Sequence, residues 1–168
     1  MTFSPTNRRA FVAGTAIVVA APFLASCGGG VTDMRKEKQF RVTKTEAQWR
    51  RELTRAEFYV LRDAGTERPY SSPLDKEKRK GTFVCAGCGN RLYSSAHKYD
   101  SGTGWPSFWQ PIDKGAVGTS TDYKIGYPRT EVHCADCGGH LGHIFGDGPR
   151  PTGKRHCING VAMDFVPA

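Results

Sequence analysis

The six cysteines of this 168-residue chain fall into groups that indicate three kinds of chemistry. They form two C-x-x-C pairs and two single residues: Cys85 with Cys88, Cys134 with Cys137, Cys157, and Cys27. The pairs have the spacing of metal ligands, and the single Cys157 stands among basic and hydrogen-bonding residues. With the four paired cysteines assigned to a metal and Cys27 to the N-terminal segment, none remains to form a disulfide with Cys157.

The two C-x-x-C pairs predict one structural zinc site. Each pair is followed by a glycine, Gly89 or Gly138, whose access to positive φ lets backbone N–H groups turn toward the sulfurs. Four thiolates at about 2.3 Å complete the tetrahedral sphere of Zn²⁺ and leave no open position, so the metal would tie the strand of Phe83 to that of Val132. Two disulfides, a rubredoxin-like iron site or a thioredoxin-type redox pair are the alternatives. The last is disfavoured because a glycine after the pair argues against a helix.

Cys157 lies in the run Arg155-His156-Cys157-Ile158-Asn159, which is typical of a reactive thiol. Positive charge on Arg155 and His156 favours the thiolate, the nucleophilic form. On a strand, Asn159 would share a face with Cys157, and its amide could orient a polar substrate. The alternative is that Cys157 is a small buried hydrophobic residue, as single cysteines often are.

Two histidines and a tryptophan are candidates for the surroundings of that thiol. His140 and His143 closely follow the second C-x-x-C pair, where either could donate a proton near a nucleophile. They could instead be structural histidines, whereas zinc ligation is disfavoured because four thiolates fill that sphere. In a glycine- and proline-containing run, we expect Phe108 and Trp109 to anchor the core and Trp105 to form a pocket wall.

Short elements must position these residues. The capping boxes Thr45-x-x-Gln48 and Thr54-x-x-Glu57 predict helices near 46–53 and 55–63, the second ending at Gly65. Short strands broken by glycine are expected farther on, at 82–84, 91–93, 130–133 and 161–165. The body is therefore expected to be one mainly antiparallel β domain with helices at its start.

Residues 1–26 predict an export signal, and residues 27–39 a lipidated cysteine and linker. Asn7-Arg8-Arg9-Ala10-Phe11-Val12 resembles a twin-arginine motif. The apolar run 11–24 has 14 residues, short of the roughly 20 that span a bilayer, so a signal region is favoured over a spanning helix. Leu24-Ala25-Ser26-Cys27 resembles a lipobox, which predicts lipidation of Cys27 and tethering in the cell envelope or periplasm. An ordinary signal peptide is the alternative.

Charge and compartment limit the partners. The net charge is +8, and loss of Arg8 and Arg9 with the signal leaves 8 − 2 = +6. The remaining basic residues are scattered rather than arranged in a stripe, so we expect no nucleic-acid partner. Exported cysteines usually form disulfides, but the twin-arginine route carries folded proteins, and zinc bound before export would protect the thiolates.

Together these segments resemble the methionine-R-sulfoxide reductases, the B-type enzymes. The matching runs, in family order over about residues 40–166, are Cys85-Ala86-Gly87-Cys88-Gly89, Tyr99-Asp100-Ser101-Gly102-Thr103-Gly104-Trp105-Pro106-Ser107-Phe108, Thr130-Glu131-Val132, His140-Leu141-Gly142-His143-Ile144-Phe145, Asp147-Gly148-Pro149 and Arg155-His156-Cys157-Ile158-Asn159. The resemblance implies that residues 40–168 form a mainly β fold of two antiparallel sheets tied by a four-cysteine zinc site, of the Mss4-like or β-tent type.

The resemblance also implies roles. Cys157 would attack the sulfoxide sulfur of methionine-R-sulfoxide in proteins or peptides and become a sulfenic acid. Trp105 would pack on the substrate methyl group. The polar groups around the sulfoxide oxygen would be His140, His143 and Asn159, with His143 as the proton donor. We expect the chain to act as a monomer.

Some residues depart from the family pattern. Thr103 stands where many relatives have a cysteine that resolves the sulfenic acid, so an external thiol is expected to do so: a thioredoxin-like envelope protein or a small thiol. Gly160 and His156 depart in pocket detail. The rival interpretation is a non-catalytic zinc-knuckle binding module, which would not need Cys157 together with Trp105.

Overall fold

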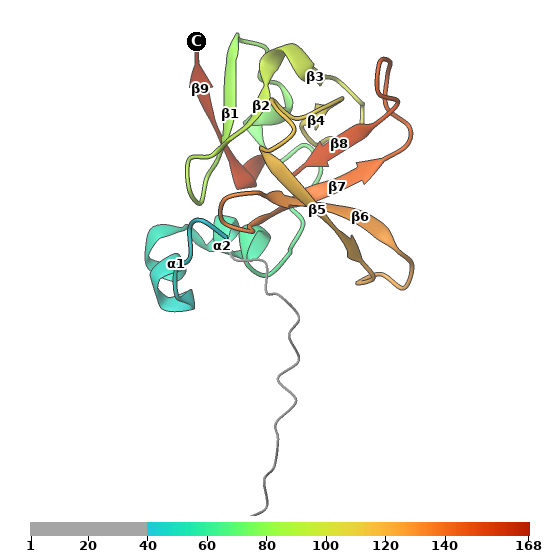
Figure 1. Cartoon of the computed structure of the whole chain (residues 1–168). Coiled ribbons are helices and arrows are strands. Elements are labelled where there is room, and N and C mark those ends of the chain that lie inside the picture. The colour runs from blue at the N-terminus through green and yellow to red at the C-terminus, as the bar shows by residue number, and fades with distance from the viewer. Residues whose placement is uncertain (1–39) are drawn as a thin grey trace, which may run out of the picture. The chain divides into compact units, whose positions relative to one another are not determined.

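The computed structural model describes residues 40–168 (Figure 1). The predicted signal at 1–26 and the lipidated Cys27 with its linker at 27–39 lie outside these residues. Within the described part, no helix combines the length and the apolar character that crossing a membrane requires.

Two short helices, α1 (Glu46–Glu52) and α2 (Arg55–Leu61), begin the described chain. Both predicted capping boxes are present, with the hydroxyls of Thr45 and Thr54 each accepting the backbone N–H three residues on. Helix α2 ends earlier than predicted. The left-handed residue that follows it is Ala64 (φ 49°) rather than Gly65.

Nine strands form two antiparallel sheets in the described residues, which confirms the predicted fold class. The strands are β1 (Gly81–Cys85), β2 (Arg91–Ser94), β3 (Lys98–Tyr99), β4 (Ser107–Phe108), β5 (Val117–Asp122), β6 (Arg129–Cys134), β7 (His140–Phe145), β8 (Arg155–Ile158) and β9 (Met163–Pro167). The described residues also contain three 3-10 helices: η1 (Pro73–Asp75) before β1, η2 (Ser95–His97) between β2 and β3, and η3 (Gly160–Ala162) between β8 and β9. The smaller sheet has the order β2-β1-β9 and the larger β3-β4-β8-β7-β6-β5.

The last predicted strand, 161–165, is displaced in the structure. Residues 160–162 form η3, and the strand β9 begins only at Met163. The Ala162 N–H donates to the Asn159 carbonyl and closes a turn, so the chain reverses before it pairs with β1. Pairing with β1 then continues to Pro167.

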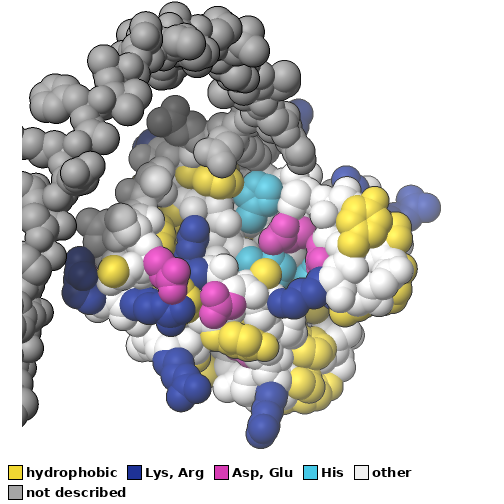
Figure 2. Space-filling view, turned by 90° about the horizontal axis from the view of Figure 1, so that it is seen from below, with side chains coloured by type: hydrophobic (Ala, Val, Ile, Leu, Met, Phe, Trp, Pro, Cys, Tyr) yellow, Lys and Arg dark blue, Asp and Glu magenta, His cyan; other side chains and the backbone are white. Residues whose placement is uncertain are grey.

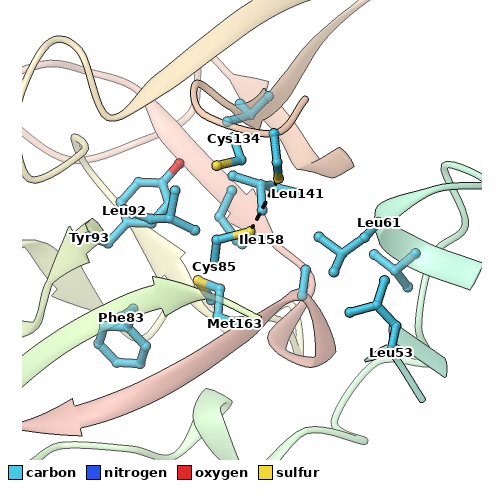
Figure 3. Packing of buried hydrophobic residues seen from close by; sticks show 14 of the residues in the cluster. Leu53, Leu61, Phe83, Cys85, Leu92, Tyr93, Cys134, Leu141, Ile158 and Met163 are labelled. Carbon is cyan, nitrogen blue, oxygen red and sulfur yellow. Dashed lines mark hydrogen bonds between the residues drawn. The ribbon is translucent and has the colours of Figure 1, made fainter. Parts of the chain in front are cut away.

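The core lies where the two sheets and the helices meet (Figure 3). Phe83 of β1 contacts the edge of Phe108 of β4 at a centroid distance of 5.0 Å, and Tyr93 of β2 stacks on Phe108 at 4.3 Å. These aromatic contacts join the smaller sheet to the larger one. Leu53 and Leu61 from the helical segment are buried in the same cluster.

Candidate active site

The four paired cysteines converge on one point between the two sheets. Their sulfurs all lie within 4.8 Å of one another, with 3.8 Å between Cys85 and Cys137 and 3.6 Å between Cys88 and Cys134. Four sulfurs about 2.3 Å from a tetrahedral ion would stand about 3.8 Å apart, so the arrangement fits zinc. A disulfide would need about 2.05 Å, and these cysteines are free thiols in the structure, unlike in the two-disulfide alternative.

Glycines shape both cysteine turns as the sequence predicts. Gly89 has φ 74° and Gly138 has φ 69°, the left-handed conformation that glycine adopts without steric cost. The Asn90 side chain donates to the Cys134 sulfur at 3.4 Å, which supports a thiolate from outside the ligand set. Because Cys85 ends β1 and Cys134 ends β6, a bound ion would tie the smaller sheet to the larger.

Cys157 lies on β8 beside a second site, a cavity of about 150 Å³. Among its lining residues are Trp105, Arg129, His143, Phe145, Cys157 and Asn159. Gly142 of β7 also lines it, and a Cβ there would stand 2.0 Å from the Cys157 carbonyl oxygen. Glycine therefore allows β7 to approach β8 closely at Cys157.

The electrostatics of Cys157 differ from the sequence expectation. Burial raises the pKa of the Cys157 thiol above its ordinary value, although Arg155 and the Thr103 hydroxyl act to lower it. His156 points to the opposite face of β8, where Nδ1 lies 3.1 Å from the Tyr93 hydroxyl. Burial lowers the pKa of His156 to about 4, so this ring is neutral at pH 7 and supplies no positive charge to Cys157.

Arg155 is the cation that does reach the thiol. Its positive charge acts to lower the pKa of Cys157, and its guanidinium binds Asp147 through two contacts of 2.9 Å. Such a bidentate pair fixes the plane of the guanidinium. Asp147 thereby holds Arg155 in place beside the sulfur.

His143 is oriented by a carboxylate on β5, two strands away in the same sheet. Its Nε2 lies 2.7 Å from Oδ2 of Asp122, which also accepts a hydrogen bond of 2.6 Å from Arg129. The pKa of Asp122 is held below its usual range, first by the Lys124 backbone N–H and then by His143, so the carboxylate accepts and Nε2 donates. Burial lowers the pKa of His143 even with this partner.

His140 occupies a different place from His143. It is buried, its Nδ1 lies 2.6 Å from Oε1 of Glu131, and its ring packs on the edge of His143 with centroids 5.3 Å apart. His140 is not among the residues that line the cavity. The structure thus brings Trp105, His143 and Asn159 around Cys157 and sets His140 behind His143.

Glu67, which the sequence reasoning missed, holds two walls of the cavity. Its backbone carbonyl accepts the indole N–H of Trp105 at 3.2 Å, and its backbone N–H donates to the Asn159 side-chain oxygen at 2.9 Å. Its carboxylate accepts the backbone N–H groups of Gly160 and Val161 at 2.5 and 3.0 Å. Glu67 lies in an irregular segment without a recognisable pattern, so no sequence signal pointed to it.

The aromatic residues near Trp105 divide only in part as predicted. Phe108 is fully buried in the core. Trp109 was expected to anchor the core as well, but it is half-buried, lies outside the core cluster and packs on His97 with ring centroids 4.5 Å apart. Trp105 is half-buried and faces the cavity instead. The other missed residues are Asp122 and Arg129, at the two ends of one loop; their opposite charges were a weak signal.

Comparison with known proteins agrees with this geometry. The SelR domain model matches residues 53–167 of the chain. Three bacterial proteins that carry the name peptide methionine sulfoxide reductase MsrB are similar over most of its length. The one from Bradyrhizobium diazoefficiens is 54% identical over 127 residues, 76% of this chain and 91% of the relative. Those from Leptospira interrogans and Leifsonia xyli are 50% and 48% identical, covering 75% and 77% of this chain and 96% and 94% of theirs.

Proposed function

We propose that Cys157 is the nucleophile of this chain, which belongs to the SelR domain family and is a peptide-methionine (R)-S-oxide reductase. The observation that carries the proposal is the single cavity shared by Cys157, His143 and Trp105. A non-catalytic binding module would have no use for a thiol placed between an arginine and a histidine–carboxylate pair. Family membership and the cavity therefore favour the enzyme.

The reduction step follows from the positions of these groups. The sulfoxide side chain enters the cavity with its methyl group against Trp105 and its oxygen toward His143 and Asn159. Cys157 attacks the sulfur as its own proton moves to the oxygen by way of His143. The sulfoxide is reduced to the thioether, and the thiol is oxidised to a sulfenic acid that carries the transferred oxygen. A raised Cys157 pKa suits this step because the thiol arrives with the proton that the oxygen needs.

His140 acts through His143 in this proposal. Its ring packs on the edge of His143, and Glu131 holds its Nδ1. It is a positioning residue, whereas His143 and Asn159 contact the sulfoxide. The hydrogen-bonded pair of Glu131 and His140 thus packs behind His143, the proposed proton donor, and holds its ring in place.

Zinc has a structural role in this proposal and takes no part in the reduction. The four thiolates of Cys85, Cys88, Cys134 and Cys137 would hold one Zn²⁺ in a closed sphere. When bound, the ion supplies a cross-link between β1 and β6. The two sheets that carry the core and the active site are then locked together.

An external thiol completes the cycle. Thr103, at the position of the expected resolving thiol, acts to lower the pKa of Cys157 and has no sulfur with which to form a disulfide. One thiol attacks the sulfenic acid, forming a mixed disulfide and releasing water, and a second thiol releases Cys157 and leaves as a disulfide. A thioredoxin-like envelope protein or a small thiol would serve.

The cellular role is repair of oxidised proteins in the cell envelope. The support is the twin-arginine pattern at Arg8 and Arg9 and the lipobox ending at Cys27. A monomer tethered through lipidated Cys27 would act on methionine-R-sulfoxide in periplasmic proteins. The mass and N-terminus of the mature protein test this directly. A retained Arg8 or an unmodified Cys27 would contradict it.

The catalytic proposal is tested with both sulfoxide epimers and dithiothreitol. We expect the wild-type protein to reduce the R epimer alone and Cys157→Ser to reduce neither epimer. Without added thiol, Thr103→Cys should form one equivalent of methionine while a disulfide forms between the new cysteine and Cys157. Equal turnover of both epimers, or activity in Cys157→Ser, would contradict the catalytic proposal. In the wild type, mass spectrometry showing a disulfide from Cys157 to Cys85, with metal release, would instead refute the external reductant.

A further inference from the structure

Three large hydrophobic side chains stand exposed on the loop that joins β5 to β6. Tyr123, Ile125 and Tyr127 are 67%, 49% and 58% exposed. The loop residues 123–128 carry one charged side chain, Lys124, whose Nζ donates to the backbone carbonyl of Ala64 at 3.0 Å. Its charge is thus engaged by the backbone of the segment that follows α2. A group of exposed apolar side chains on a protein surface commonly marks a binding site.

This loop is continuous with the active site. At its start, Asp122 holds His143, and at its end, Arg129 lines the cavity and pairs with Asp122 at 2.6 Å. Phe145, 36% exposed, also lines the cavity. Figure 2 shows hydrophobic side chains at the right of this face, with acidic, basic and other groups between them and the central histidine side chains.

The cavity is too small for more than the oxidised side chain, so the neighbouring residues of the substrate must lie outside it. Pockets for whole small-molecule ligands start at about 300 Å³, and this one has about 150 Å³. It takes one side chain, so the residues on both sides of an oxidised methionine in a polypeptide remain outside. An extended chain advances about 3.3–3.6 Å per residue, which places the first flanking residues on the rim.

We propose that Tyr123, Ile125 and Tyr127 bind apolar residues that flank the oxidised methionine in an extended polypeptide segment. This inference rests on the proposed function and states which methionine-R-sulfoxide substrates the enzyme prefers. Methionines mostly lie in hydrophobic cores, so the segments around those oxidised in unfolded chains are rich in apolar residues. Tyrosine offers a large contact area with few rotatable bonds, so little conformational entropy is lost on binding.

The test compares three substrates of the full-length protein: N-acetyl-methionine-R-sulfoxide amide, a pentapeptide with leucines flanking the sulfoxide, and one with serines. We expect the triple variant Tyr123→Ser, Ile125→Ser, Tyr127→Ser to lose about tenfold in kcat/KM on the leucine peptide, through KM. The unflanked substrate should change less than about twofold, the size of a near-neutral contact. Val166→Ser, at an apolar residue 50% exposed on β9 of the other sheet, is the matched control and should leave all three unchanged.

The outcomes separate the two proposals. Equal losses on all three substrates would mean that the loop only supports Asp122 and Arg129, and would overturn the substrate preference. If the triple variant changed only the KM for the thiol reductant, the surface would bind the reductant, and the proposed substrate preference would also be wrong. A wild-type protein inactive on every substrate would refute the proposed function itself. If the triple variant does not fold, Tyr127→Ser alone, compared with Tyr127→Phe, must show the same loss on the leucine peptide only.

Discussion

His143 and Cys157 stand directly opposite each other on β7 and β8. Opposed residues in an antiparallel pair have Cβ atoms about 4.5–5.5 Å apart, so the backbone ladder sets the distance between the proposed proton donor and the proposed nucleophile. Asp122, on β5, then fixes the orientation of the His143 ring from two strands away. The reactive pair is held by the sheet rather than by loops.

Asp122→Asn is expected to impair the proton donor without weakening substrate binding. The amide cannot enforce donation from Nε2 of His143, so kcat should fall by about 100-fold with little change in KM. The carboxylate acts to raise the pKa of His143, and its loss lowers that pKa further. The acid limb of the pH–rate profile, at which neutral His143 becomes protonated, should therefore move to lower pH. Asp113→Asn, at an exposed aspartate, is the control, and an unmoved limb in Asp122→Asn would argue against the role of His143.

Arg155→Met is expected to raise the pKa of Cys157. Arg155 is the largest influence that lowers this pKa, and burial already holds it above the ordinary value. The rate of alkylation by iodoacetamide, measured against pH, reports the thiolate. Its midpoint should move to higher pH, so that the fraction of thiolate at a given pH below the midpoint falls. Arg150→Met should not move the midpoint, and an unchanged midpoint in Arg155→Met would show that the guanidinium does not act on the sulfur.

Cys134→Ser is expected to remove the metal and destabilise the whole domain. Binding of a structural zinc contributes several kcal/mol to folding, and loss of that tie should lower Tm by more than about 10 °C. Elemental analysis should find about one zinc per wild-type chain and almost none in the variant. Cys157→Ser is the matched control and should keep both the metal and the Tm. Iron instead of zinc, or full metal content in Cys134→Ser, would contradict the assignment.

Glu131 should make the fold sensitive to acid. Its hydrogen bond with His140 and that from the Ser120 hydroxyl help to lower the Glu131 pKa to about 2, from an ordinary 4.5. A carboxyl with a depressed pKa in the folded state contributes stability above its unfolded pKa, and loses it as pH falls through the folded pKa. Urea unfolding should show about 2 kcal/mol lost between pH 4.5 and 2, after allowance for partial exposure. Glu131→Gln should be less stable at pH 7 and lack this part of the pH dependence.

The metal site and the helix starts could be predicted from sequence because their interactions are local. The ligands within each C-x-x-C pair lie three residues apart, and the capping boxes of Thr45 and Thr54 close within one turn. Matching these runs to a family then identified Cys157 and Trp105. The strands β5 and β7 were not predicted, since Val117–Asp122 is a polar edge strand and His140–Phe145 carries two histidines.

What only the tertiary structure decided depends on contacts between distant segments. His156 turns to one face of β8, where it is buried and neutral. Arg155 turns to the other face, where it acts on the Cys157 thiol. The raised pKa of Cys157 results from burial by several elements, which neighbouring residues in the sequence do not report. Glu67 reaches Asn159 across 92 positions, and Asp122 reaches His143 across 21. The sequence by itself determined which residues are the candidates for the reaction, because their types and spacing carry the chemistry. The fold determined how they are charged and oriented, because burial and hydrogen-bond geometry are properties of the packed chain.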